Sequence, residues 1–210
     1  MKLLFDPAAA ATHLSGADER LALVIARAAP CSLQPKRLGS LFSVLFRAIV
    51  FQQLNGKAAS TILGRVKALF PGTSVKPAAL LAMPEDKLRA AGLSRNKLAA
   101  IRDLAAKTLD GTVPTPAAAR RMSDAELVAR LTEVRGIGPW TVHMLLMFDL
   151  GRPDVMPSGD YGVRMGFKKL YRKRSEPSPK LIERHAARWQ PYRSVAAWYL
   201  WRVHEIELPG

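Results

Sequence analysis

The segment that most limits how this chain can fold is residues 134–141, Val-Arg-Gly-Ile-Gly-Pro-Trp-Thr, in which two glycines stand two positions apart. Glycine lacks a side chain and accepts positive backbone φ angles, so two helices can meet here through a very tight turn. The exposed backbone N–H groups of such a turn can approach a phosphate that a bulkier loop would keep at a distance. We therefore interpret the segment as a helix-hairpin-helix unit that can hold a nucleic-acid backbone.

The sequence on both sides of the glycines carries the signals of helix ends. Ser123 and Glu126 match the capping-box pattern, which predicts a helix over 124–134 that ends just before the first glycine. Pro139 suits the first turn of a second helix, predicted over 141–150, whose residues are so apolar that we expect it to be buried. A Gly-x-Gly pair alone would favour an ordinary turn, but its place between two strong helices favours the hairpin.

Helical patterns continue along the rest of the chain. Apolar residues recur at helical spacing, and no segment shows the alternation typical of a strand. We therefore predict an all-α fold. The predicted helices cover residues 18–29, 38–53, 56–69, 94–109, 124–134, 141–150, 161–171, 179–188 and 193–205.

The composition points to a negatively charged partner. Lys and Arg number 32 against 17 Asp and Glu, which gives a formal net charge of +15. This excess of positive charge favours a polyanionic partner. Charge alone does not tell whether that partner is DNA, RNA or an anionic membrane. A chain of 210 residues is long enough for one good core or for two small helical lobes.

The number of cysteines and the length of the apolar runs exclude further classes of protein. The single cysteine, Cys31, excludes an internal disulfide and any iron–sulfur or zinc site built on several thiolates. Residues 1–7 hold too short an apolar run for a signal peptide, and no stretch is long enough for a membrane span. We therefore expect a cytoplasmic protein, associated with the nucleoid in a bacterium.

Four motifs follow one another in a recognisable order. They are residues 47–53 (Arg-Ala-Ile-Val-Phe-Gln-Gln), residues 92–97 (Gly-Leu-Ser-Arg-Asn-Lys), the hairpin with Asp160-Tyr161 within 134–167, and residues 189–201, from Trp-Gln-Pro-Tyr-Arg-Ser to Trp-Tyr-Leu-Trp. Together they resemble the helix-hairpin-helix DNA glycosylase superfamily, and within it the alkyl-base branch of the 3-methyladenine DNA glycosylase II enzymes. The resemblance covers nearly everything after about Leu38. We expect the compact form, because 210 residues are too few to contain the extra N-terminal β-rich domain of larger members as well.

The resemblance implies the helix-hairpin-helix glycosylase fold, with two helical lobes and a DNA-binding cleft between them. We expect a single glycosylase unit over 1–210. Its middle lobe is expected over about 41–152 and contains the hairpin. The second lobe is expected to combine residues 1–40 with residues 153–210.

The resemblance also sets expectations for partners and bound groups. It implies a monomer that acts on double-stranded DNA containing damaged bases and that has no membrane partner. No cofactor is expected to be required, and no iron–sulfur cluster is expected. A structural Na⁺ or K⁺ is expected at the hairpin, held by the main-chain carbonyls of Thr132, Val134 and Ile137.

Asp160 is the candidate catalytic residue. Breaking an N-glycosidic bond builds positive oxocarbenium character on the sugar, and a carboxylate aimed at C1′ stabilises that charge and can orient or deprotonate a water. Asp160 opens the predicted helix 161–171, and Arg164 stands one turn later, where its charge can stabilise the carboxylate. The alternative is that Asp160 only caps this helix, and the two roles can coexist. The resemblance places the family's catalytic aspartate at this position.

An aromatic pocket would suit the expected substrates. Alkylated purines such as 3-methyladenine and 7-methylguanine carry a positive charge, which aromatic rings select by stacking and cation–π attraction. The resemblance places Trp140 and Trp201 at pocket positions. Met144 and Arg202 stand where another member of the branch has tyrosines, which leaves the range of lesions open. The neighbouring Trp198-Tyr199 pair is expected to pack in the core.

The resemblance also suggests how DNA would be held. A base inside a duplex is out of reach, so the enzyme must flip it out and fill the gap with a wedge. Gln53 and Leu54 are the suggested wedge region, although Leu54 could equally belong to the core. The backbone amides of Gly136, Gly138 and Trp140 should bind phosphates beside the lesion. The expected DNA contacts are Gln53, Leu54, Lys97, Gly136, Ile137, Gly138, Pro139, Thr141 and Arg164.

Residue 140 separates two types of chemistry. Bifunctional relatives carry a lysine in the second half of the hairpin, which forms a Schiff base with the sugar and cleaves the strand. This sequence has Trp140 there, so we predict a monofunctional enzyme that uses water and leaves an abasic site. Two alternatives stay open. One is a glycosylase for another damaged base, and the other is a non-catalytic helix-hairpin-helix DNA-binding protein in which Asp160 is only a cap.

Overall fold

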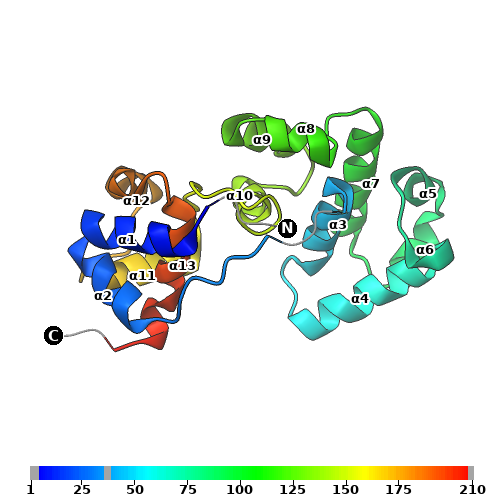
Figure 1. Cartoon of the computed structure of the whole chain (residues 1–210). Coiled ribbons are helices and arrows are strands. Elements are labelled where there is room, and N and C mark those ends of the chain that lie inside the picture. Colours follow the sequence, from blue (N-terminus) through cyan, green and yellow to red (C-terminus); the bar gives the residue numbers. More distant parts are fainter. Residues whose placement is uncertain (1–4, 36–38, 208–210) are drawn as a thin grey trace. The chain divides into compact units, whose positions relative to one another are not determined.

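The computed structural model describes residues 5–35 and 39–207, and these residues form helices and turns without a β-strand (Figure 1). The predicted all-α fold class is confirmed. The predicted helix start at Leu38 lies outside the described residues. The α-helices are α1 (Pro7–Ala17), α2 (Glu19–Arg27), α3 (Leu41–Phe51), α4 (Gly56–Ala68), α5 (Pro77–Ala82), α6 (Glu85–Ala90), α7 (Arg95–Leu109), α8 (Pro116–Arg121), α9 (Asp124–Leu131), α10 (Pro139–Phe148), α11 (Tyr161–Leu170), α12 (Pro179–Ala186) and α13 (Arg193–Arg202), with short 3₁₀ turns η1 (Pro71–Thr73), η2 (Ala187–Trp189) and η3 (Val203–Glu205).

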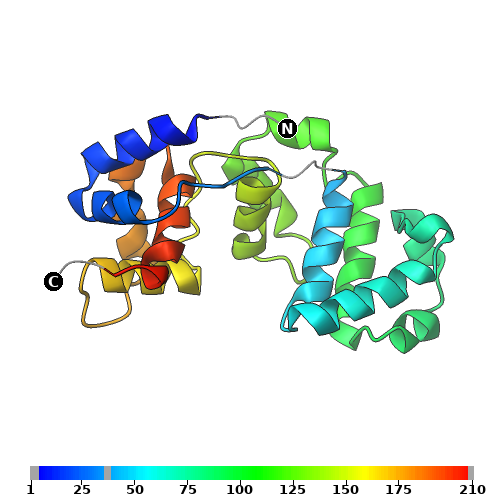
Figure 2. The same ribbon diagram turned by 60° about the horizontal axis from the view of Figure 1, so that its bottom comes forward.

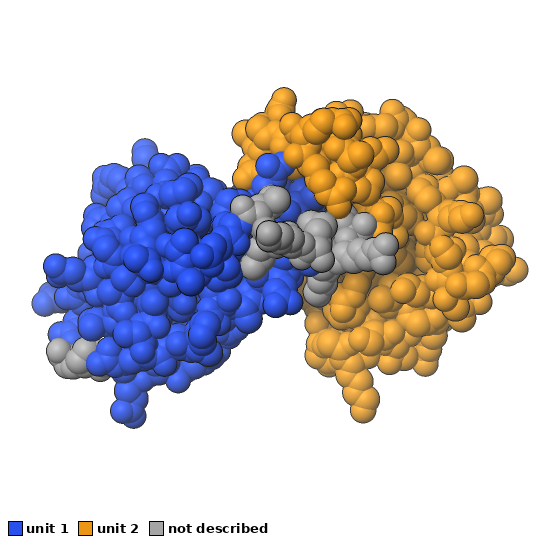
Figure 3. All heavy atoms as spheres, in the orientation of Figure 1, with its two compact units in different colours: residues 1–37, 143–210 blue, residues 38–142 orange. Residues whose placement is uncertain are grey.

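The chain divides into two compact units (Figure 3). Unit 1 combines residues 1–37 with residues 143–210, and unit 2 is the continuous segment 38–142. The division falls within α10, earlier than the lobe boundary that we expected at about residue 152. The hairpin segment therefore belongs to unit 2 and Asp160 to unit 1.

Unit 2 is organised around α7. The helices α3, α5 and α6 pack against α7, and α4 packs on α3 (Figure 2). Leu45 and Ile49 of α3 and Ile101 and Leu104 of α7 are 0% exposed, so the two helices share one apolar core. The Lys97 ammonium donates a hydrogen bond of 2.6 Å to the carbonyl of Val50, and burial lowers the pKa of Lys97. This contact ties the first turn of α7 to the end of α3.

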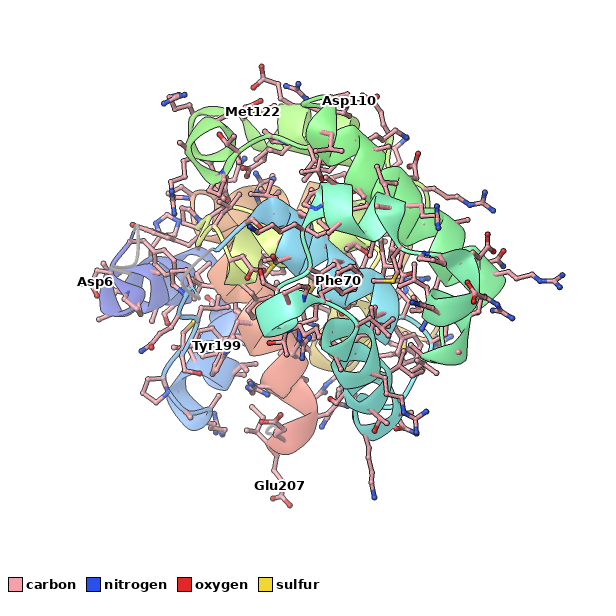
Figure 4. The ribbon with its side chains drawn as sticks, turned by 90° about the vertical axis from the view of Figure 1, so that its right-hand side faces the viewer. Asp6, Phe70, Asp110, Met122, Tyr199 and Glu207 are labelled. Atoms are coloured by element: carbon pink, nitrogen blue, oxygen red, sulfur yellow. The ribbon has the colours of Figure 1, made fainter. Side chains whose placement is uncertain are left out.

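Unit 1 is organised around α13, whose residues 194–200 are all buried. The helices α1, α2 and α11 pack against it. Tyr199, labelled in Figure 4, and Trp198 are only 2% and 5% exposed, which confirms that this pair packs in the core. The contact with α11 is very close, because a Cβ atom added at Gly166 would lie 2.0 Å from the carbonyl oxygen of Leu200.

A buried carboxylate, Asp18, links distant parts of unit 1. It accepts hydrogen bonds from Tyr171 Oη (2.6 Å), His185 Nε2 (3.0 Å) and Trp189 Nε1 (3.1 Å). It also caps α2 through the backbone N–H groups of residues 20 and 21. Burial acts to raise the pKa of Asp18, but the bonds from His185, Tyr171, the residue 21 amide and Trp189 outweigh it and hold the pKa far below its ordinary value. Burial and the Asp18 charge raise the pKa of Tyr171.

The helices that the sequence analysis missed are short or lack a clear apolar face. The helix α1 precedes Asp18, where we predicted the first helix to begin. The six-residue helices α5, α6 and α8 are too short to show a helical period.

The limits of the two helices beside the glycine pair also differ from the prediction. The helix α9 ends at Leu131, before the predicted end at residue 134, and the hydroxyl of Thr132 bonds back to the carbonyl of Val128 (2.7 Å). The helix α10 begins at Pro139 and ends at Phe148, two residues earlier at each end than predicted. No helix in the described part of the chain combines the length and the apolar character that a membrane crossing needs.

Candidate active site

The hairpin between α9 and α10 has the tight turn that the glycine pair predicts. Gly136 adopts a φ of +78°, and the N–H of Ile137 donates to the carbonyl of Val134 at 3.0 Å. Pro139 lies in the first turn of α10, as expected, although the helix begins at Pro139 itself and not at the predicted residue 141. A Cβ atom at Gly136 would also lie 3.3 Å from Cβ of Ala100, so both backbone conformation and space favour glycine there.

Side chains from two neighbouring helices of unit 2 support this hairpin. Gln52, directly after α3, donates from Nε2 to the carbonyl of Gly136 at 2.8 Å. Asp103 of α7 accepts from the N–H of Arg135 (2.7 Å) and from the ammonium of Lys107 (3.0 Å), which also binds the carbonyl of Glu133. Sequence reasoning missed these supports, because no local pattern links α3 and α7 to the hairpin.

The two glycines should respond differently to substitution. At Gly138 an added Cβ would meet no atom within 4 Å and the residue has no positive φ, so nothing within unit 2 demands glycine there. If the Gly138 amide lies against a phosphate, Gly138→Ala will keep the melting temperature and weaken binding to duplex DNA, as measured by fluorescence anisotropy. Gly136→Ala, the matched variant, will destabilise the fold by about 1 kcal/mol or more because of its strained φ. Equal DNA affinity for Gly138→Ala and the unchanged protein would contradict a phosphate contact.

The suggested wedge lies between α3 and α4. Gln53 adopts a positive φ of 55°, and Asn55 caps α4 by accepting from the N–H of Ala58 at 2.9 Å. Leu54 lies between them with 38% of its surface exposed, so the alternative that it belongs to the core is wrong. Gln53 and Leu54 directly follow Gln52, so the wedge region and the hairpin are joined within unit 2 by the bond from Gln52 to Gly136.

Two basic side chains expected to contact DNA have partners within the protein. The ammonium of Lys97 bonds to the carbonyl of Val50, as described above, and so supports the end of α3. Arg164 was also placed beside Asp160. Its guanidinium instead pairs with Glu176 (2.7 Å) and donates to the carbonyl of Pro177 (3.0 Å). Helical spacing predicted that Arg164 would pair with Asp160. Its ion pair is formed with Glu176, which lies beyond the end of α11.

Asp160 lies at the N-cap of α11, in unit 1. Its Oδ1 accepts a hydrogen bond from the N–H of Val163 at 2.8 Å and one from the indole N–H of Trp201 at 2.7 Å. The capping role that we kept as an alternative is therefore real. It accounts for the bond from Val163 but not for the indole, which comes from a different helix, α13.

The loop before Asp160 is anchored to the start of α13. Arg193 binds the carboxylate of Asp154 with two N–H groups, at 2.7 and 2.9 Å. The hydroxyl of Ser194 donates to the carbonyl of Arg152 (2.7 Å) and accepts from the N–H of Val155 (2.9 Å). Such a two-pronged ion pair is geometrically specific. Both the approach to Asp160 and its carboxylate are thus held by α13.

The expected pocket residues fall into different surroundings. Trp201 binds Asp160 and stacks on Phe148, with ring centroids 5.9 Å apart and an interplanar angle of 20°. Phe148 was not among the expected pocket residues. The guanidinium of Arg202 lies 4.7 Å from the ring centroid of Trp198 and pairs with Glu205 at 2.7 Å, so it acts within the C-terminal part of unit 1. Met144, on α10, is half-buried, and Trp140 is 50% exposed.

The fold and these sites define a class of protein. An all-helical chain with a helix-hairpin-helix turn, followed by an acid at the start of the next helix, is typical of proteins that bind DNA and excise bases from it. The sequence matches the HhH-GPD superfamily of base excision DNA repair proteins over residues 46–191, and the chain belongs to this superfamily.

Individual relatives are similar over almost the whole chain. DNA-3-methyladenine glycosylase 1 of Schizosaccharomyces pombe is 37% identical over 92% of this chain and 86% of its own length. The structure of the 3-methyladenine DNA glycosylase from the same yeast in complex with abasic DNA superposes with a TM-score of 0.77, at 36% identity, over 94% of this chain and 97% of its own. The DNA-3-methyladenine glycosidase of Bacillus halodurans has a TM-score of 0.83, at 34% identity, over 96% and 90% of the two chains.

Proposed function

We propose that this protein is a monofunctional DNA glycosylase that removes alkylated purines, such as 3-methyladenine and 7-methylguanine, from double-stranded DNA and leaves an abasic site. The observation that carries the proposal is the carboxylate of Asp160, held at the start of α11 by two N–H donors. The names of the relatives, 3-methyladenine glycosylases from a yeast and a bacterium, support the substrate class. We place the enzyme where the DNA is, in the cytoplasm or nucleoid.

The proposed reaction is a hydrolysis in which Asp160 acts on the sugar. The bond between C1′ and the purine nitrogen breaks, and its electron pair leaves with the base, which loses its positive charge. The carboxylate of Asp160 stabilises the positive charge that develops on the sugar. The oxygen of a water then bonds to C1′, and a proton of that water passes to Asp160 or to solvent.

Aromatic and soft side chains would select the charged base. Cation–π attraction contributes roughly 0.5 to 2 kcal/mol, which favours an alkylated purine over its neutral parent. We propose Trp140, Trp201 and Met144 as pocket residues. Because the alkylated base already leaves readily, the pocket needs no strong acid to protonate it.

The hairpin and the wedge would together distort the DNA. We propose that the backbone amides of Gly136, Gly138 and Trp140 bind phosphates and that Leu54, with Gln53, fills the space left by the flipped nucleotide. The exposure of Leu54 supports the wedge, because a large apolar side chain with 38% of its surface exposed is suited to inserting between bases.

The end of α9 and the first half of the hairpin bring together carbonyls that suit a monovalent cation. Thr132 follows the last residue of α9, where helix carbonyls concentrate negative charge, and the carbonyl of Val134 accepts a hydrogen bond from the N–H of Ile137. We propose that the main-chain carbonyls of Thr132, Val134 and Ile137 would hold Na⁺ or K⁺, since neutral oxygen atoms suit a hard cation. Its charge would hold these carbonyls together and stabilise the turn.

A base-release assay tests the proposed function. Duplex DNA treated with a methylating agent is incubated with the protein, and the freed bases are identified by chromatography. We expect 3-methyladenine or 7-methylguanine to be released without strand cleavage and without a borohydride-trapped adduct. A trapped adduct would contradict the monofunctional mechanism. Absence of release, with salt-dependent binding of about −0.9 in log–log slope per phosphate and no preference for abasic sites, would favour a non-catalytic DNA-binding protein.

A further inference from the structure

Two glycines of α11 leave space for close contact with α13 in unit 1. Gly162 and Gly166 stand four positions apart, so they lie on the same face of α11. A Cβ atom at Gly166 would meet the backbone of α13, 2.0 Å from the carbonyl oxygen of Leu200. At Gly162 it would instead meet the indole of Trp201, 2.7 Å from Cδ1 and 3.1 Å from Nε1. Gly166 therefore brings the helices together, and Gly162 leaves room for one side chain.

The indole that occupies this room is fixed by its surroundings. Its N–H donates to Oδ1 of Asp160 at 2.7 Å, and its ring stacks on Phe148. A side chain at residue 162 would collide with the edge of the indole ring that carries the N–H. A methyl group there would push the indole away from the carboxylate, because its Cβ would lie only 2.7 Å from Cδ1 of the ring. The same Cβ would also lie 3.2 Å from Oδ1 of Asp160.

Two donors from separate helices therefore meet on a single oxygen of Asp160. The N–H of Val163 belongs to the first turn of α11, and the N–H of Trp201 belongs to the last turn of α13. One capping bond fixes the position of Oδ1, and a second bond from another direction also restrains the plane of the carboxylate. A catalytic carboxylate gains from such restraint, since charge stabilisation depends on its direction toward the reacting carbon.

We infer that Trp201 is a positioning residue that fixes the orientation of the Asp160 carboxylate, and that Gly162 is required because it leaves room for the indole N–H to reach it. The inference rests on the proposed function, in which Asp160 acts on the sugar. It gives Trp201 a role separate from stacking on the flipped base. It also explains why glycine stands at residue 162, where no positive φ demands it.

Three variants separate this role from base stacking. Trp201→Phe keeps an aromatic ring beside Phe148 and removes the N–H. Gly162→Ala keeps the N–H and displaces the indole. Gly159→Ala is the matched control, because a Cβ there meets no atom within 4 Å although the residue directly precedes Asp160. Each variant is assayed on methylated duplex DNA under single-turnover conditions, with thermal melting and binding to an abasic-site analogue measured on the same preparations.

We expect Trp201→Phe and Gly162→Ala each to lower the single-turnover rate at saturating enzyme by roughly tenfold to a hundredfold, the size of one lost hydrogen bond to a charged group. Affinity for the abasic analogue should stay unchanged, and Gly159→Ala should match the unchanged protein. In the Trp201→Phe background, Gly162→Ala should lower the rate little further, since both act through the same bond.

Other outcomes would overturn the inference. If Trp201 only stacks on the base, Trp201→Phe will raise the half-saturating enzyme concentration and leave the saturated rate unchanged. If the two single variants multiply in the double variant, Gly162 does not act through the indole. A melting curve that reveals an unfolded Gly162→Ala leaves Trp201→Phe and its rate-against-affinity comparison as the deciding test. Absence of base release by the unchanged protein would instead reject the proposed function itself.

Discussion

Replacement of Asp160 by asparagine is expected to lower the rate of base release by roughly 10²- to 10⁴-fold, the usual contribution of a positioned acid or base, without unfolding the protein. Asparagine caps helices as well as aspartate does, so the bond from Val163 to the side chain can persist. Its amide carries no negative charge and cannot stabilise a cationic sugar. The rate is measured by chromatography of the bases freed from methylated duplex DNA.

The control for this substitution is the loss of another acid from the same unit. Glu19, exposed in the first turn of α2, can be changed to glutamine with no expected effect on base release. Asp160→Asn should still bind duplex DNA that carries an abasic-site analogue. Equal release by Asp160→Asn and the unchanged protein would mean that a different residue performs the chemistry. Loss of both release and binding would mean that the substitution disturbs more than the reaction.

The largest expected effect on stability is at Asp18. Asp18→Asn should lower the free energy of unfolding by about 3 to 5 kcal/mol, the usual effect of removing one partner of a buried charged network. In either orientation the asparagine NH₂ group would face donors: Tyr171, His185 and Trp189 on one side, or the backbone N–H groups of residues 20 and 21 on the other. Denaturant unfolding followed by circular dichroism measures the change. The matched control is Asp6→Asn, because Asp6, labelled in Figure 4, is an exposed cap of α1 that asparagine can replace at little cost.

The same carboxylate predicts how stability depends on pH. The pKa of Asp18 is far below its ordinary value in the folded protein and is about 3.9 in the unfolded chain. Its contribution is therefore fully present above the unfolded pKa and is lost as the pH falls toward the folded pKa. The melting temperature of the native protein should fall more steeply below pH 5 than that of Asp18→Asn. Parallel curves for the two proteins would contradict a stabilising charge on Asp18.

Local signals made the hairpin and the place of Asp160 at the start of a helix predictable. The capping box at Ser123 and Glu126 forms as expected, and Pro139 begins α10. Each of these features depends on a few neighbouring residues, so it can be predicted from the local sequence. The all-α fold class followed from apolar periodicity for the same reason.

Contacts between distant residues could not be predicted in this way. Arg164 has the right helical spacing to meet Asp160, but Glu176 pairs with it instead, because tertiary packing decides among several possible partners. Nothing beside Gln52 marks its bond to Gly136, and nothing beside Gly162 marks the indole that it accommodates. Asp18 looked like a simple helix start, whereas its three side-chain donors come from the other end of the chain.

The bonds made by Asp18 also bear on the order in which the protein forms during its synthesis. They join residues 153, 167 and 171 positions apart, whereas unit 2 is one uninterrupted stretch of chain. On the ribosome, the segment that contains the hairpin can therefore fold before α11 and α13, against which α1 and α2 pack or bond, have been synthesised. We expect a chain that ends before Trp189 to form the hairpin and bind DNA through it. Such a chain would lack α13, and the carboxylate of Asp160 would then lose its hydrogen bond from Trp201. During synthesis, the proposed DNA-binding segment would then form first and the proposed catalytic site last.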